Sequence, residues 1–501
     1  MSSSTILIFI IVYFGILLLI SQIISKKGQD NDSFFKANKN SKWYLVAFGM
    51  IGTSLSGLTF ISVPGEVGSP NGEQFKYFQF ILGQAVGLIV IAKVLLPLYY
   101  RMNLTSIYSY IEKRMGTNSY KTAASIFLVS RTIGSALRFY LVVLVLQRYV
   151  FDYYHIPFPL TVFLGLTFVF LYTYRSGLKA IIITDTLQTF FLVSSVFITI
   201  YFVLNSLDLT VFESVSAIRN SNYSKTFFFD DFLTNKYHFA KQFLGGLLIM
   251  IAMVGLDQDL MQKNISCKNI KEAQKNMYTF TVIFVTISLL FLSLGALLYM
   301  YAAKNNISVP LDLVTNKPRT DLLFPEIALN HLATVPALVF LLGIIAATFA
   351  TTDSALTALT TSFCVDFLGM DKTENISNPK NVKRRHLVHL TFSFLFFLVI
   401  IVLNSFNDSS VVALVFKAAS YTYGPLLGLY AFGLLQKNRI VTDKLVPWFC
   451  IVAPILTYVL SENSKTLFGY VFDNELILIN ALITYTGLYF TSKKTDEKIY
   501  F

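Results

Sequence analysis

Long, uninterrupted apolar runs dominate the sequence. The run ILIFIIVYFGILLLI, near the start of the chain, contains no charged residue and shows none of the polar alternation of a barrel strand. Such runs predict helices, because a continuously apolar segment must satisfy its backbone hydrogen bonds internally when lipid surrounds it. We predict about 13 spans near the length that a bilayer requires, at about 5–25, 43–66, 78–100, 122–149, 157–174, 180–206, 240–259, 277–302, 333–363, 386–404, 410–433, 445–461 and 474–491.

Two of these spans contain residues that interrupt a helix. The second span reads GMIGTSLSGLTFISVPGEVG, with five glycines and Pro64, and the seventh span has Gly245-Gly246 and Gly255. We predict breaks at these glycines, with exposed carbonyl groups that line a cavity or meet a ligand.

The two interrupted spans are five helices apart, which predicts two repeats of five helices. The first repeat would cover about 43–207 and the second about 240–433, with additional helices at 5–25, 445–461 and 474–491. Because five is odd, the second repeat begins on the opposite side of the membrane. We therefore predict an all-α polytopic membrane protein that forms one transmembrane domain over residues 1–501.

Composition agrees with a chain that lies in a lipid bilayer. The sequence is 54% hydrophobic and only 14% charged, whereas soluble proteins are about 25% charged. The three cysteines and five histidines have no paired spacing, so no disulfide framework and no zinc site is predicted.

The net charge of +12 would suit nucleic-acid binding, but its distribution indicates membrane topology instead. The first span is preceded by no basic residue and is followed by Lys26-Lys27, which predicts an extracytoplasmic N-terminus. Alternating sides from there place about 26 basic residues inside and about 9 outside. The C-terminus is then cytoplasmic, and nucleic acid is excluded as a partner.

Five ionisable residues lie within apolar spans, where charge is costly and usually functional: Arg131, Arg138, Asp185, Asp353 and Lys417. Asp353 lies among many hydroxyl residues of the ninth span. A hydroxyl-rich helix alone is typical of close packing. A carboxylate among the hydroxyls instead favours a small hard cation.

Five motifs occur in order along the chain: GTSLSGLTFISVPG, YRSGLKAIIITDTLQ, DQDLMQKNISCKNIKEAQK, TTDSAL and YTYGPLLGLY. Together they resemble the solute:sodium symporter family, which includes sodium-coupled sugar, proline, pantothenate and sialic acid carriers, and the resemblance runs from about residue 5 to about residue 490. The resemblance implies a LeuT-type fold of two inverted repeats. It also implies sodium-coupled import, by alternating access, of a small polar organic solute such as a sugar, a sugar acid like sialic acid, or another organic acid. Sodium would be the coupling ion, with no other cofactor.

The resemblance also implies two sodium sites. The first would lie between spans two and nine and use the carbonyls of Gly52, Leu55 and Ala347 with the hydroxyl of Thr351. This sequence has Ala350 where the family usually has a hydroxyl residue, which should weaken the site.

The second sodium site would use Asp185, Asp353 and Ser354. Two converging carboxylates repel each other when no cation lies between them, so proton binding is the alternative.

For the solute, the resemblance implies Ser54, Ser56 and Thr59 in the broken span, with Gln79 and Arg131. Arginine suits the bidentate capture of a carboxylate. The alternative is that Arg131 and Arg138 pair with structural groups and never meet the solute. Lys417 is expected to be a structural or gating residue linked to the cytoplasmic side.

Three other functions remain as alternatives. They are a proton-coupled carrier of the same fold, a transporter-derived solute sensor, and a membrane-embedded enzyme with an aspartyl dyad. No enzyme motif supports the last, and the sequence ends about ten residues after its final span, which leaves no room for a signalling domain. Richness in Ile, Lys, Asn and Phe suggests a bacterial inner-membrane protein. We expect it to function as a monomer.

Overall fold

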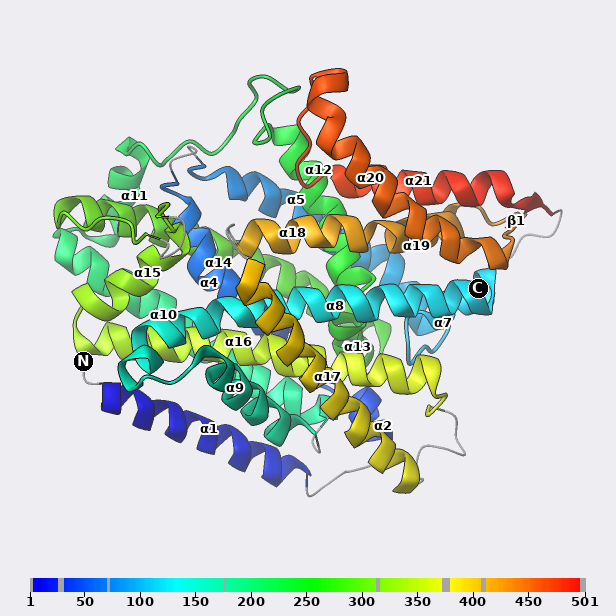
Figure 1. The fold of residues 1–501 in the computed structure, drawn as a ribbon, viewed down its shortest axis with the longest axis horizontal. Helices are drawn as coiled ribbons and strands as arrows, with labels where there is room; N and C mark the ends of the chain where they lie inside the picture. Colours follow the sequence, from blue (N-terminus) through cyan, green and yellow to red (C-terminus); the bar gives the residue numbers. More distant parts are fainter. Residues whose placement is uncertain are drawn as a thin grey trace.

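A computed structural model describes residues 3–25, 31–69, 73–174, 177–311, 316–371, 379–406 and 411–495. The structure is a bundle of helices, in which α8, α10 and α16 cross the view nearly parallel to one another (Figure 1). The start of α1 and the terminal strand β2 lie at opposite ends of this bundle. A chain that crosses a membrane an odd number of times has its two ends on opposite sides.

The first half of the chain contains an N-terminal helix, a short amphipathic segment and the helices of the first predicted repeat. Their bounds are α1 Ser3–Ser25, α2 Asn31–Lys36, η1 Ala37–Lys39, α3 Trp43–Ser54, α4 Gly57–Glu66, α5 Lys76–Val90, η2 Ile91–Leu95, α6 Leu96–Arg101, α7 Ser109–Met115, α8 Thr117–Leu146, η3 Gln147–Phe151, η4 Asp152–Tyr154, α9 Phe158–Thr173, α10 Gly177–Leu207 and α11 Val211–Asn220.

The second half contains the helices of the second predicted repeat, two peripheral helices and one small antiparallel pair of strands. Their bounds are α12 Phe239–Met250, η5 Ile251–Gly255, α13 Gln258–Ile265, α14 Ile270–Lys304, η6 Thr320–Leu322, α15 Leu323–Glu326, η7 Ile327–His331, α16 Thr334–Ser362, η8 Phe363–Phe367, α17 Pro379–Phe406, α18 Val411–Thr422, α19 Gly424–Leu435, β1 Arg439–Ile440, η9 Asp443–Leu445, α20 Val446–Phe468, α21 Leu476–Thr491 and β2 Lys493–Lys494.

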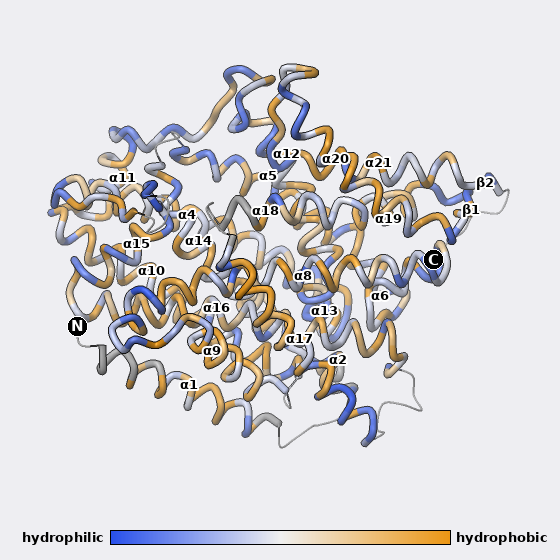
Figure 2. Tube along the Cα trace, viewed as in Figure 1, coloured by the Kyte–Doolittle hydropathy of each residue, from blue (hydrophilic) through white to orange (hydrophobic). Residues whose placement is uncertain are grey.

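Every predicted span coincides with one helix or with two or three consecutive helical segments. In the described part of the chain, seven helices are long and apolar enough to cross a bilayer, or nine if each of two bent pairs counts as one span. Apolar positions follow the helices and polar positions gather in the loops at their ends (Figure 2). The all-α membrane architecture is thus confirmed, whereas the total of about 13 spans stays a prediction.

The second span is broken as predicted. Helix α3 ends at Ser54 and α4 begins at Gly57, with a bend of 58° between them. Leu55 and Ser56 have non-helical backbone angles. Carbonyl groups in the last turn of a helix lack intrahelical partners, so the end of α3 presents carbonyl oxygens inside the bundle.

The seventh span is also bent, by 63°, between η5 and α13. The Gly255 and Leu256 carbonyls at this break accept hydrogen bonds from the Tyr99 and Tyr108 hydroxyls at 2.8 and 3.0 Å. The tyrosines thereby satisfy backbone oxygens that lipid could not. The predicted break at Gly255 is confirmed.

The predicted break at Gly245-Gly246 is wrong, because α12 runs straight through both residues. A Cβ atom on Gly246 would lie 2.1 Å from the Phe80 carbonyl oxygen of α5. These glycines therefore let α12 and α5 approach closely, which is the packing role of small residues in membrane helices.

Helices α10 and α16 form the most extensive helix pair of the structure. Their approach is close, since a Cβ atom on Gly343 of α16 would lie 2.1 Å from the Ser195 hydroxyl of α10. Asp185 lies on α10 and Asp353 on α16. The pairing of the two helices therefore positions these two carboxylates against each other.

Candidate functional site

Two broken helices meet buried charged residues in the middle of the bundle. Helix α13, after the second break, packs against α3 and α16. It contributes Asp257 at its N-cap together with Asp259 and Lys263, and all three are at most 2% exposed. The DQDLMQK segment belongs to one of the motifs that resemble the family. Its three charged residues were nevertheless not predicted as site residues.

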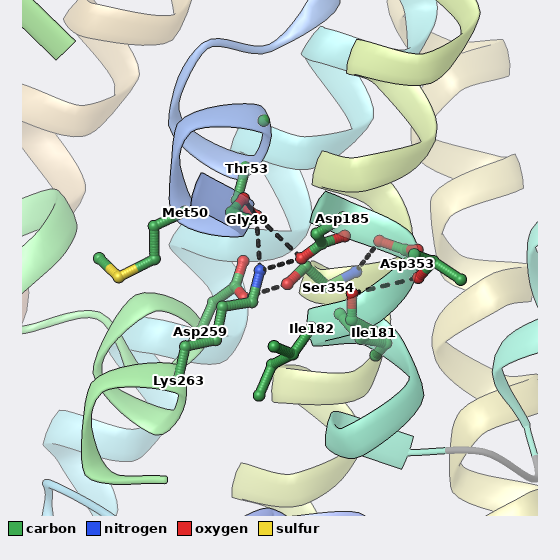
Figure 3. A network of polar contacts seen from close by, with 12 residues as sticks. Gly49, Met50, Thr53, Ile181, Ile182, Asp185, Asp259, Lys263, Asp353 and Ser354 are labelled. Carbon is green, nitrogen blue, oxygen red and sulfur yellow. Dashed lines mark hydrogen bonds and ion pairs between the residues drawn. The ribbon is translucent and has the colours of Figure 1, made fainter. Parts of the chain in front are cut away.

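Lys263 forms an ion pair with Asp185 (Figure 3). Its Nζ atom lies 2.6 Å from Asp185 Oδ2 and also donates to the Thr53 hydroxyl. The ammonium group and the carboxylate are both fully buried. The pair therefore ties α13 to α10 and to the end of α3.

Arg131 of α8 is engaged by two carboxylates of α13. Its guanidinium group donates to Asp259, and Asp257 Oδ2 lies 3.8 Å from the second terminal nitrogen. The Tyr423 hydroxyl donates to Asp257 at 2.6 Å, and the Ser354 hydroxyl donates to Asp259 at 2.7 Å. The structural alternative for Arg131 is therefore supported by its contacts, although the residue also lines the cavity described below.

Asp353 differs from the other buried carboxylates because its partners are neutral. The Tyr172 hydroxyl donates to Asp353 Oδ2 at 2.8 Å, and the backbone N–H of Ser354 donates to Oδ1. No lysine or arginine of the described residues forms an ion pair with it. Figure 3 shows the Asp185 and Asp353 side chains next to each other.

A small cavity of about 70 Å³, lined by both apolar and polar side chains, lies beside the break of the second span. The predicted residues Ser54, Ser56, Thr59 and Arg131 line it, with Arg138 and Gln84 as further polar members. Within the described residues, the Ser54 and Ser56 hydroxyls, the Gln84 amide oxygen and Arg131 Nε have no hydrogen-bond partner.

Gln79 does not line this cavity. Its amide nitrogen donates to the Tyr237 carbonyl, and its amide oxygen accepts from the Phe228 backbone N–H, each at 2.9 Å. Gln79 thus fastens the long loop before α12 to α5. Gln84, five residues further along the same helix, reaches the cavity instead.

A wider cavity of about 490 Å³ is lined by Lys236 and Tyr237, which belong to the loop between α11 and α12. Counting spans alternately from an outside N-terminus predicts that this loop lies outside. Tyr77 and Phe416 line both this cavity and the smaller one, so they lie where the two cavities adjoin. Lys417 also lines the wide cavity, 3.7 Å from Glu462. Lys417 and the loop of Lys236 and Tyr237 thus lie on the same side of the protein, so the predicted topology and the predicted link of Lys417 to the cytoplasmic side do not agree with each other.

Of the residues implied for the first sodium site, Gly52 and Leu55 lie at the end of α3, and Ala347 and Thr351 lie on α16, which packs against α3 and α4. The Gly52 backbone N–H donates to the Thr189 hydroxyl at 3.0 Å, and the Thr351 hydroxyl donates to the Thr348 carbonyl at 2.8 Å. A Cβ atom on Gly52 would lie 3.5 Å from the Ala350 Cβ. Ala350 therefore faces the implied site with a methyl group where a hydroxyl is usual.

Comparisons with known proteins identify the family of this chain. The profile of the sodium:solute symporter family matches residues 34–440. The sodium/sialic acid symporter NanT of Aliivibrio fischeri is 21% identical over 487 residues, which are 93% of this chain and 90% of that protein.

Two solved structures show the same fold. A Na⁺-coupled sialic acid symporter, in its substrate-bound outward-open state, matches with a TM-score of 0.80 at 18% identity, over 98% of this chain and 99% of the other. Mhp1, a nucleobase-cation-symport-1 family transporter in a closed conformation, matches with a TM-score of 0.53 at 13% identity, over 90% and 92%. The fold is thus the LeuT type. The chain belongs to the sodium:solute symporter family, and it couples sodium to the transport of a small solute across a membrane.

Proposed function

We propose that this protein imports a small organic acid together with sodium, by alternating access from the wide outer cavity to the cavity at the broken second span. The observation that carries the proposal is Arg138, which lines the inner cavity without any ion pair or hydrogen bond to a described residue. A half-buried guanidinium group with no ion-pair partner among the described residues favours an anionic ligand, and a planar carboxylate fits its fork of donors.

The remaining polar atoms of the cavity favour a solute that also carries hydroxyl or amide groups. The unpaired Ser54, Ser56 and Gln84 atoms cost about 1–3 kcal/mol each when buried without a partner. A sugar acid would satisfy them, and sialic acid, for which the relative NanT is named, is one. We therefore retain Ser54, Ser56, Thr59 and Arg131 as solute residues, and Gln84 replaces Gln79.

Replacing Arg138 by glutamine tests the solute class. Loss of a charge-assisted interaction of about 1.5–3 kcal/mol should raise the half-saturating concentration of the acid roughly tenfold to a hundredfold. Arg138→Lys should retain part of the affinity, because it keeps the charge and loses the fork. The measurement is uptake of labelled sialic acid by cells, with Arg148→Gln at the end of the same helix as control. Unchanged half-saturation in Arg138→Gln would remove the residue from the solute site.

For coupling, we propose a first sodium ion held by the carbonyls of Gly52, Leu55 and Ala347 and the hydroxyl of Thr351. The end of α3 supports this site, because it presents carbonyl oxygens where α16 packs against it. The second proposed sodium site comprises Asp185, Asp353 and Ser354. Proton binding between the two carboxylates is the alternative for this second site.

A hydroxyl residue at position 350, as the family usually has, should strengthen sodium binding at the first site. In Ala350→Ser, one added oxygen ligand should lower the sodium concentration for half-maximal uptake about threefold to tenfold. A sodium titration of solute uptake measures this, and Ala355→Ser on the same helix is the matched control. An unchanged sodium requirement in Ala350→Ser would argue against a sodium ion at this place.

A solute sensor without net transport is the second candidate function. A counterflow assay in proteoliposomes distinguishes a sensor from a carrier, because only a carrier exchanges labelled solute across the membrane.

We also propose that the protein lies in a bacterial inner membrane as a monomer, with its N-terminus outside and its C-terminus in the cytoplasm. The ends of the described chain, at opposite ends of the bundle, support an odd number of crossings (Figure 1). Lys26-Lys27 and the residues after Thr495 lie outside the described part of the chain. The two repeats at about 43–207 and 240–433 remain part of this proposal, supported by the two bends of similar angle.

A further inference from the structure

An apolar pocket of about 220 Å³ lies between the N-terminal helix and the bundle. Its walls come from α1, from α8 with η3, from α9 and from α16. Figure 1 shows α1 along the edge of the bundle with α9 beside it, and these two helices are in contact. The pocket is separate from the two cavities described above, because it shares no lining residue with either of them.

The walls of this pocket leave no free hydrogen-bonding side chain for a polar ligand. Of the described side chains that line it, only two carry a polar atom, and both hydroxyls are already paired. Thr161 donates to the Gln147 amide oxygen at 2.6 Å, and Thr348 donates to the Ile344 carbonyl at 2.7 Å. Water in an apolar space needs two or more polar partners, so the pocket excludes water.

The lining of the pocket is suited to hydrocarbon. The Phe14 ring of α1 stacks on Phe168 of α9, with 4.4 Å between the ring centroids, and it meets Phe349 of α16 edge-on at 4.8 Å. An apolar cavity of about 150 Å³ stays dry and takes up hydrocarbon. The larger pocket of this protein therefore favours an apolar ligand.

The pocket is elongated along the helix axes. On α8 and the π-helical turn η3, its lining residues form one row at helical spacing: Phe139, Val142, Val143, Leu146 and Phe151. The row rises about 18 Å from its first to its last residue. One leaflet of a bilayer has a hydrocarbon thickness of about 15 Å, so the length of the pocket matches one acyl chain.

The mouth of the pocket faces the bilayer. Ile11 of α1 and Leu164 of α9 line the pocket and are 57% and 38% exposed. The exposed residues around them are also apolar, namely Ile8, Val12, Leu160 and Phe163. Because α1 and α9 belong to a membrane protein, the hydrocarbon of the bilayer is in contact with this apolar surface.

The position of η4 places the upper end of the pocket near the lipid headgroups. Tyr153 and Tyr154 of η4 follow directly after the row that ends at Phe151. Tyrosine is enriched where a membrane meets water. The pocket therefore begins just below the headgroups and extends into the region of the acyl chains.

We propose that this pocket binds one acyl chain of a membrane phospholipid as a structural ligand between α1, α8 and α9. The inference goes beyond the proposed function, because it depends neither on the solute nor on sodium. A Cβ atom on Gly57 would lie 2.3 Å from Thr348 Oγ1 and 2.7 Å from Val142 Cγ2. These two pocket residues thus pack on the break of the second span. An acyl chain supplies the contacts that the pocket side of their helices otherwise lacks.

The test is native mass spectrometry of the protein, purified in detergent and incubated with dioleoyl-phosphatidylglycerol. The wild type should retain one phospholipid per protein molecule. Val143→Phe combined with Leu164→Phe places two rings in the pocket and at its mouth, and should lower the fraction of lipid-bound protein at least tenfold. The matched control is Val129→Phe with Leu160→Phe, which makes the same changes at exposed positions of α8 and α9 outside the pocket. The control should retain lipid as the wild type does.

Thermal unfolding shows whether the variants fold and respond to lipid. A ligand that binds only the folded state raises its melting temperature, so the phospholipid should stabilise the delipidated wild type and the control but not the filled variant. If the filled variant does not fold, Ile11→Asn replaces it, because a polar amide at the mouth should lower lipid retention at least threefold. Its control is Ile16→Asn, at an exposed position of the same helix outside the pocket.

Three results would overturn the inference. Equal retention of phospholipid in the pocket variant and its control would show lipid that adheres without a site. Retention of detergent but not of phospholipid by the wild type would show a nonspecific apolar space. A dimer of the wild type that the pocket variant loses would show that a second copy of the chain covers the pocket.

Discussion

Replacing Arg131 by alanine should abolish transport. We expect the loss to come from destabilisation of the folded protein and not from weaker solute binding alone. The guanidinium group is 4% exposed and faces the carboxylates of Asp257 and Asp259. Removing one partner of a buried ion pair leaves an uncompensated buried charge and typically costs 3–5 kcal/mol. That cost is a large fraction of the about 5–15 kcal/mol by which native proteins are typically stable.

Thermal unfolding of the purified variant measures this effect. Arg131→Met combined with Asp259→Leu should recover much of the lost stability, because an apolar pair of similar volume often replaces a buried ion pair without loss. Arg131→Lys should lie between the wild type and the alanine variant. A stable Arg131→Ala protein with only a raised half-saturating concentration would show instead that Arg131 acts mainly on the solute.

The second large effect is expected for Asp185→Asn. This change leaves the Lys263 ammonium buried beside Thr53 without its carboxylate, so the free energy of unfolding should fall by about 3–5 kcal/mol. It also removes an anionic oxygen from the proposed second sodium site. Transport should be lost for both reasons.

A double variant separates the two contributions. Lys263→Met added to Asp185→Asn removes the unpaired ammonium, so the melting temperature should recover towards the wild-type value. The response of that temperature to sodium should nevertheless stay weak, because the anionic ligand is still missing. Full recovery of the sodium response would show that Asp185 serves only as a partner of Lys263.

The sequence was sufficient to predict the fold class and the central break. Apolar runs near twenty residues predicted helices because lipid leaves few other structures possible, and the glycines with Pro64 predicted the break that the structure places at Leu55 and Ser56. Asp185 and Asp353 lie on α10 and α16, which pack against each other, and their shared role in a sodium site stays a prediction.

The contacts of the cations could not be predicted in the same way. Lys263 was not among the predicted site residues, yet it is 1% exposed and paired with Asp185, 78 positions away. Arg131 meets Asp259 across 128 positions. Such pairings depend on the direction in which α13 enters the bundle after the bend between η5 and α13. A pattern of hydrophobic positions does not determine the angle of that bend.

Two local errors have simple physical causes. Gln79 and Gln84 lie on the same helix, and only the rotation of α5 within the bundle decides which amide reaches the cavity. Gly245-Gly246 and Gly255 look alike in sequence, because glycine serves both close helix packing and helix breaks. A polar residue such as Gln84 in an otherwise apolar run was the available signal for a cavity position.

The central claim, sodium-coupled import of an organic acid, is tested most directly by uptake into proteoliposomes that contain the purified protein. Labelled sialic acid is added with sodium outside and potassium inside, and neutral sugars and other organic acids compete for uptake. The account predicts accumulation above the external concentration, dependent on the inward sodium gradient, inhibited by acids more than by neutral sugars and lost in Arg138→Gln. Accumulation that follows a proton gradient without sodium, or that neutral sugars inhibit better than acids do, would contradict it.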